Sequence, residues 1–177
     1  IMAFEILSDP NLKLSKKIKI QLIRKLSECS GHMGIAGGQY LDLNYENKKV
    51  SKNKIINMEE KKTGKLFSFC CVAPLIIKNK KNKILLSFEK IGLDIGLLFQ
   101  IADDLIDYAG NTKKAGKKTK KDKKKGKATL ISLLGYKNTI KYSNIIKSRI
   151  INNLKKNGSQ LDNLKETLDY ILMRSKW

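Results

Sequence analysis

The segment 83–109 constrains the fold more than any other part of the chain. Its apolar residues recur every three or four positions over several turns, which predicts one long amphipathic helix. The stripe consists of Ile84, Phe88, Ile91, Ile95, Leu98, Ala102 and Leu105. A helix of this kind needs neighbours that cover its apolar stripe, and no stretch shows the alternating pattern of a β-strand. The sequence therefore predicts an all-α helical bundle.

Further helices are expected on both sides of this segment. Ser15 is a suitable cap for a helix that runs to about residue 41. Its apolar positions are Ile18, Leu22, Leu26, Cys29 and Met33. This helix ends in GHMGIAGGQ, and because glycine is costly inside a helix unless another backbone comes close, we expect a tight helix–helix crossing there. The other predicted helices span residues 3–8, 51–77 (in which Pro74 can introduce a kink), 128–157 and 161–173.

The bulk composition is that of a single globular domain over residues 1–177. Of the 177 residues 41% are hydrophobic, which is enough to form a core. No run of about 18 uncharged apolar residues occurs, so no membrane span is expected. The first residues lack the basic region and apolar core of a signal peptide, and the three cysteines form no CxxC pair. We therefore expect reduced thiols and a cytoplasmic location.

The formal net charge of +21 comes almost entirely from lysine, because arginine occurs only at Arg24, Arg149 and Arg174. Proteins that bind nucleic acid favour arginine for bidentate contacts with phosphate and guanine. Lysine, asparagine and isoleucine are also the residues that an A/T-rich coding sequence favours. We therefore attribute the charge mainly to composition, and nucleic-acid binding is the weaker interpretation.

Three carboxylates interrupt this basic background in the segment FQIADDLIDY, residues 99–108. On a helix Asp103 and Asp107 lie one turn apart on the same face, and Asp104 lies about 100° around the axis from Asp103. Neighbouring carboxylates repel one another unless a cation screens them. Because Mg²⁺ binds few carboxylates, keeps water ligands and bridges to phosphate oxygens, the pattern predicts a Mg²⁺ site. The alternative is an exposed acidic patch, which the surrounding apolar residues disfavour.

A lysine-rich segment follows the acidic cluster. Between positions 113 and 127 there are ten lysines and one acid, Asp122. A charge run is usually only a solvated segment, but cations beside a carboxylate-bound metal suit a polyphosphate ligand. No aromatic residue occurs between 111 and 127 to stack on a base, which disfavours a nucleic-acid arm. Lys117 and Lys127, which each follow a glycine, are the preferred diphosphate contacts.

The segment KKTGKLF, residues 61–67, places Lys62 and Thr63 in a predicted helix, where an ammonium and a hydroxyl group can both face a phosphate. This pair alone is weak evidence, because such pairs are common in helices. His32 is the only histidine, and we assign it a structural role. With one histidine, neither a Cys/His zinc site nor a Ser-His-Asp triad can be argued.

Four segments stand in a fixed order along the chain: GGQYLDL (37–43), KTGKLF (62–67), FQIADDLIDYAGN (99–111) and GKKTKKDKKKGKATLISLLG (116–135). In order and spacing they resemble the polyprenyl diphosphate synthases, and most closely the bacterial short-chain farnesyl type. The resemblance implies an isoprenoid-synthase-type helical bundle that joins isopentenyl diphosphate to dimethylallyl or geranyl diphosphate. In the family, Mg²⁺ ions assist loss of the allylic diphosphate, the isopentenyl double bond attacks the carbocation, and a proton leaves.

The resemblance also gives roles to single residues. Asp103 and Asp104 resemble the leading carboxylates of the family's second aspartate-rich motif. We expect Asp103 to be the metal ligand, with Asp104 and Asp107 assisting directly or through water. Lys62 and Lys117 resemble lysines that contact diphosphate. Together with the residue patterns above, the predicted catalytic residues are Lys62, Thr63, Gln100 and Lys117, and the predicted substrate-binding residues are Phe99, Gln39, Asp42 and Lys127.

The sequence departs from the family in one main respect. Asp103-Asp104 is its only Asp-Asp pair, whereas the family has two aspartate-rich motifs that face each other across the bundle. The missing motif would lie upstream of Ile1, so we expect a single partial domain, the C-terminal 60% or so of a synthase without its N-terminal helices. Such a piece is expected to be inactive alone. Asn111 and Lys120 stand where many relatives have Asp and Gly.

Two other interpretations stay open. A non-catalytic helical subunit that pairs with an active synthase would begin near Met2 and show no turnover alone. A lysine-rich nucleic-acid binder would show a steep salt dependence of binding. The resemblance further implies a homodimer but does not indicate its interface.

Overall fold

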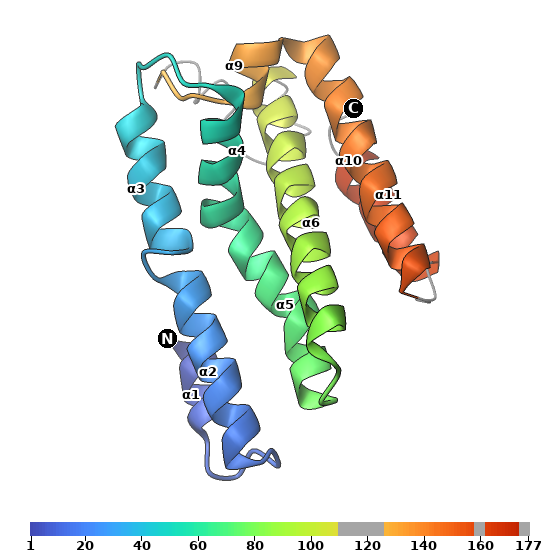
Figure 1. Cartoon of the computed structure of the whole chain (residues 1–177). Coiled ribbons are helices and arrows are strands. Elements are labelled where there is room, and N and C mark those ends of the chain that lie inside the picture. Colours follow the sequence, from blue (N-terminus) through green and yellow to red (C-terminus); the bar gives the residue numbers. More distant parts are fainter. Residues whose placement is uncertain (110–125, 158–161, 174–177) are drawn as a thin grey trace.

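A computed structural model describes residues 1–109, 126–157 and 162–173, and all regular secondary structure within them is helical. Figure 1 shows helix α6 in the centre, with α4 and α5 on one side and α10 and α11 on the other. The all-α bundle is therefore confirmed. The elements are α1 (Met2–Ser8), α2 (Lys16–Ser30), α3 (Ile35–Tyr45), α4 (Lys52–Glu59), the π-helical turn η1 (Glu60–Gly64), α5 (Lys65–Ile77), α6 (Asn82–Ala109), α9 (Leu130–Leu134), α10 (Tyr136–Lys156) and α11 (Asp162–Met173).

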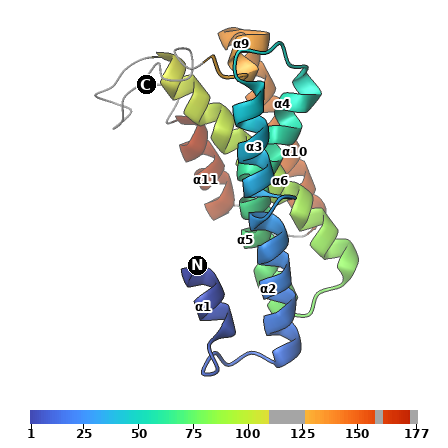
Figure 2. The same ribbon diagram turned by 90° about the vertical axis from the view of Figure 1, so that its left-hand side faces the viewer.

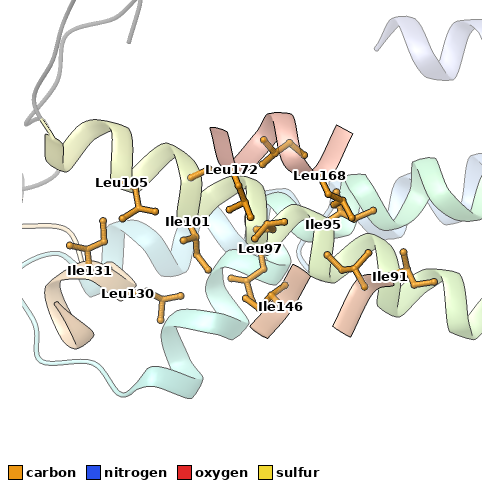
Figure 3. Packing of buried hydrophobic residues seen from close by; sticks show 14 of the residues in the cluster. Ile91, Ile95, Leu97, Ile101, Leu105, Leu130, Ile131, Ile146, Leu168 and Leu172 are labelled. Atoms are coloured by element: carbon orange, nitrogen blue, oxygen red, sulfur yellow. The ribbon is translucent and has the colours of Figure 1, made fainter. Parts of the chain in front are cut away.

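The predicted stripe of α6 forms the centre of the core. Its residues from Ile91 onwards are buried, while Ile84 and Phe88 are half-buried. Figure 3 shows side chains of α9, α10 and α11 packed around α6. Each fully buried leucine or isoleucine stabilises the fold by about 1.5–3 kcal/mol, so this cluster holds the C-terminal helices on α6. The cluster includes Ile95, Leu97, Ile101, Leu105, Leu130, Ile131, Ile146, Leu168 and Leu172.

The prediction of one continuous helix over residues 15–41 is wrong. This part of the chain is divided into α2 and α3, and the break lies in the glycine-rich segment 31–34. Ser15 does cap α2, because its Oγ accepts a hydrogen bond from the Ile18 N–H. Met33 lies in the break and its side chain is exposed, so it does not continue the apolar stripe of α2. Figure 2 shows α1 beside α2, at the end of the molecule away from α3.

Two further predicted helices are also interrupted. The helix predicted over 51–77 contains α4, η1 and α5, with a π-helical turn in its middle. The helix predicted over 128–157 is divided by Gly135, whose φ of +77° is a left-handed conformation that favours glycine. Before this break, Thr129 and Ser132 form a reciprocal capping box at the start of α9. In the part of the chain that the structure covers, no helix is long and apolar enough to span a membrane.

Candidate functional site

The tight crossing predicted from the glycine-rich segment lies between α3 and η1. A Cβ atom on Gly38 would lie 2.2 Å from the backbone N and 2.4 Å from the Cα of Lys62, so only glycine allows this approach. Asp42 follows Gly38 one turn later on α3. The crossing therefore places a carboxylate of α3 beside the Lys62-Thr63 pair of η1.

Lys62 and Asp42 form an ion pair across this crossing. Lys62 Nζ donates a hydrogen bond to Asp42 Oδ2 at 2.5 Å. Asp42 is only 5% exposed, and Lys62 keeps part of its side chain accessible. A buried carboxylate requires a partner of this kind, because an unpaired charge in the interior is strongly destabilising. The ion pair thus fixes the direction of the Lys62 ammonium group.

Thr63, the next residue, takes part in a hydrogen-bonded chain to α6. Its Oγ1 donates to Gln100 Oε1 at 3.2 Å, and Gln100 Nε2 donates to Asp104 Oδ1 at 2.9 Å. The amide of Gln100 is therefore held at both ends, with its oxygen and nitrogen assigned to different partners. Lys62 and Thr63 thus connect η1 to two different helices, α3 and α6. Three of the predicted site residues are joined directly in this way.

The three aspartates occupy the last two turns of α6. Asp104 and Asp107 are buried, at 5% and 7% exposure, whereas Asp103 is half-buried. Among the residues that the structure describes, no group of three or more His, Cys, Asp or Glu side chains is arranged to hold a metal ion. The assignment of the aspartates as metal ligands therefore stays a prediction.

Glu59, the last residue of α4, lies close enough to Asp104 for their charges to interact, although no motif predicts it. Its side chain is buried, and Oε2 has no hydrogen-bond partner among the described residues. Burial, followed by the charge of Asp104, raises the pKa of Glu59 to about 8, against the opposing effect of Lys62. The available sequence signal was its position three residues before Lys62, a spacing that places two side chains on one side of a helix.

Two further predicted residues, Phe99 and Gln39, differ in their burial. Phe99 is half-buried and its ring centroid lies 5.5 Å from that of Phe67 on α5. Gln39 is exposed on α3, and within the described residues no hydrogen bond joins it to Lys62 or Thr63.

Lys127 lies where the chain returns to the site. The preceding carbonyl, of Gly126, accepts a hydrogen bond of 2.8 Å from Asn47 N, which anchors the returning segment to the end of α3. The charge of Lys127 acts on the carboxyl group of Glu59, so this lysine lies near the cluster. Lys117 and the rest of the lysine-rich segment up to residue 125 lie outside the described residues.

Comparisons with known proteins agree on one family. A family model described as polyprenyl synthetase matches residues 1–171. A farnesyl diphosphate synthase of Micrococcus luteus is 34% identical over 166 residues, covering 94% of this chain and 57% of that protein. The farnesyl diphosphate synthase of Escherichia coli is also 34% identical, over 99% of this chain and 60% of its own length. The chain therefore spans less than two thirds of the curated relatives that it matches.

Solved structures give the same result for the fold. A geranyltransferase from Helicobacter pylori, crystallised with magnesium and isoprenyl diphosphate, superposes with a TM-score of 0.81 at 31% identity. The match covers 97% of this chain and 55% of that chain. A FPP/GFPP synthase from Zymomonas mobilis gives a TM-score of 0.80 at 35% identity, over 96% of this chain and 56% of its own. These similarities confirm an isoprenoid-synthase fold for the described helices.

Proposed function

Because the chain belongs to the polyprenyl synthetase family, we propose that it is part of a prenyltransferase. The proposed reaction joins isopentenyl diphosphate to dimethylallyl or geranyl diphosphate, with farnesyl diphosphate as the product. The observation that carries this proposal is the convergence of three segments far apart in the sequence. Lys62 pairs with Asp42 of α3 while its neighbour Thr63 is hydrogen-bonded to Gln100 and, through it, to Asp104 of α6.

Lys62 has the chemistry to receive the allylic diphosphate. In the proposed step the allylic C–O bond breaks and its electron pair leaves with the diphosphate. A new C–C bond then forms from the isopentenyl double bond, and a proton is lost. An ammonium group that is already positioned stabilises the negative charge that develops on the leaving group. Asp42 holds Lys62 ready for this role, and Lys127 adds a second positive charge nearby.

Gln100 and Phe99 are proposed to stabilise the carbocation that forms when the allylic diphosphate leaves. The amide dipole of Gln100 is fixed by Thr63 and Asp104, so it needs little reorganisation when charge develops. The rings of Phe99 on α6 and Phe67 on α5 provide an apolar surface. Such a surface keeps water from the carbocation.

The carboxylates of this region suit magnesium. Asp104 and Asp107 are buried carboxylates with hard oxygen atoms, and Oε2 of Glu59, whose carboxyl lies in the field of Asp104, has no hydrogen-bond partner within the described residues. Mg²⁺ takes one or two protein carboxylates and completes its shell with water and substrate phosphates, so a closed cluster of protein ligands is not required. We propose Asp103 as its protein ligand, with Asp104 and Asp107 assisting directly or through water. The ion would supply charge neutralisation at the diphosphate.

The full protein is proposed to act as a homodimer in the cytoplasm. The 177 residues alone are proposed not to condense the two substrates, because they hold a single Asp-Asp pair. Formation of farnesyl diphosphate by the purified chain would contradict this second statement.

Diphosphate binding tests the proposed site directly. Titration calorimetry with inorganic diphosphate is expected to show weak binding that Mg²⁺ strengthens, because the cation bridges carboxylate and phosphate oxygens. In Asp103→Ala this strengthening is expected to disappear. Asp169→Ala is the matched control, since Asp169 forms an ion pair with Lys147 on the outer helices. Equal affinity with and without Mg²⁺ in the unmodified chain would overturn the proposed function.

A further inference from the structure

Packing alone does not explain the burial of Glu59. Its side chain is only 4% exposed, and glutamate is seldom so deeply buried without a partner. Yet Oε2 has no hydrogen-bond partner among the described residues. Most buried polar atoms in folded proteins are hydrogen-bonded, so an exception indicates a place for a water molecule or an ion.

The charged groups around Glu59 are those of the candidate site. After burial, the groups that most affect its carboxyl are Asp104, Lys62, Asp42 and Lys127, in that order. These residues come from α6, η1, α3 and the returning segment. The carboxyl of Glu59 therefore lies within the field of charged groups from four described segments of the chain.

The adjacent residue, Glu60, has a different environment. It is half-buried, and its charged neighbours are Asp94, Lys65 and Arg149. Two consecutive glutamates thus face different parts of the molecule, one towards the candidate site and one towards the α6–α10 contact. This contrast makes Glu60 a matched control for Glu59.

We propose that Glu59 belongs to the cation site, and that its Oε2 binds the Mg²⁺ of this site beside Asp104, directly or through a water ligand of the ion. This inference rests on the proposed function and extends the site beyond the aspartate-rich motif of α6. A carboxylate oxygen is a preferred ligand for Mg²⁺ and for its water shell. A cation at this point would offset the repulsion between Glu59 and Asp104, which explains why both acids can be buried in the same region.

The experiment compares Glu59→Gln, Glu60→Gln and Asp103→Ala in the 177-residue chain. The measured quantity is the factor by which Mg²⁺ strengthens binding of inorganic diphosphate, obtained by calorimetry with and without the metal. Glu59→Gln is expected to lower this factor at least tenfold, while its affinity for diphosphate without Mg²⁺ changes less than twofold. Glu60→Gln is expected to match the unmodified chain. Gln has nearly the same shape as Glu, and thermal unfolding of each variant verifies that it is folded.

The outcomes separate this inference from the proposed function. If Asp103→Ala loses the effect of Mg²⁺ and Glu59→Gln keeps it, the role of Glu59 is wrong and the proposed site stands. If Mg²⁺ has no effect on the unmodified chain, both are wrong. Equal losses in Glu59→Gln and Glu60→Gln, or a loss in Glu59→Gln that does not depend on Mg²⁺, would also overturn the role of Glu59.

Discussion

Helix α6 carries two buried aspartates, nearly three turns apart, whose hydrogen-bond partners and neighbouring charges differ. Asp94 accepts hydrogen bonds from Arg149 on both carboxylate oxygens: Arg149 Nε donates to Oδ2 at 2.8 Å, and Nη2 donates to Oδ1. Asp104 accepts a hydrogen bond from Gln100 of the same helix and lies in the field of a second acid, Glu59. Both aspartates are less than 10% exposed.

The difference separates a charge that supports the fold from one that belongs to the candidate site. A planar guanidinium neutralises Asp94 and ties α10 to α6, so nothing further is needed there. At Asp104 the neighbours include a neutral amide, that of Gln100, and the carboxyl group of Glu59, whose pKa the charge of Asp104 raises. We therefore expect a change at Asp94 to affect mainly the stability of the fold, and a change at Asp104 to affect mainly the candidate site.

The largest effect is expected from Arg149→Met, which leaves Asp94 buried without its cation. Removing one partner of a buried ion pair is strongly destabilising, and because Arg149 is about half exposed we expect a loss of about 3 kcal/mol in the free energy of unfolding. Urea denaturation measures this loss. Lys147→Met, on the same helix, removes only an outer ion pair and should cost less than about 1 kcal/mol. If Arg149→Met instead weakened Mg²⁺-dependent diphosphate binding, the division of α6 into two functions would be wrong.

Much of the fold was predictable because the periodicity of apolar residues is strong in α6. The sequence indicated the helix to within one residue at its start and the burial of its stripe from Ile91. The breaks at 31–34 and at Gly135 were not predicted, since apolar spacing continues across them. They depend on local backbone conformation, such as the positive φ of Gly135, which a helical pattern does not reveal.

The site was predictable where a motif fixes both residue type and spacing. Lys62, Thr63, Gln100 and Asp104 were all expected from their motifs, and three of them are linked by hydrogen bonds. Glu59 was not expected, because its importance arises from burial and from charges on other helices. Similarly, the pairing of Lys62 with Asp42 depends on the close approach at Gly38, of which the sequence shows only the glycine.

A smaller effect is expected from the pH dependence of stability, and it tests the end of α6 that carries the candidate site. The pKa of Glu59 is about 8 in the folded chain against an ordinary value of 4.5, so the folded state binds more protons between these values. The contribution of Glu59 to stability is therefore greatest below pH 4.5 and falls as the pH rises towards 8. Without divalent cations, we expect Glu59 to contribute a fall of about 2 kcal/mol between pH 5 and 7. Urea denaturation of Glu59→Gln should show a correspondingly flatter profile; identical profiles would mean that the carboxyl is compensated in some other way.

The smallest effect is expected from the chain that links η1 to α6 through Thr63, Gln100 and Asp104. Thr63→Val keeps the side-chain shape and removes the donor to Gln100 Oε1, which should cost about 1 kcal/mol of stability. A double-mutant cycle with Gln100→Leu isolates the pairwise energy, because residues in one hydrogen-bond network do not act independently. A coupling of about 0.5–1 kcal/mol would show that Thr63 stabilises the orientation of Gln100. Strictly additive losses would show that it does not.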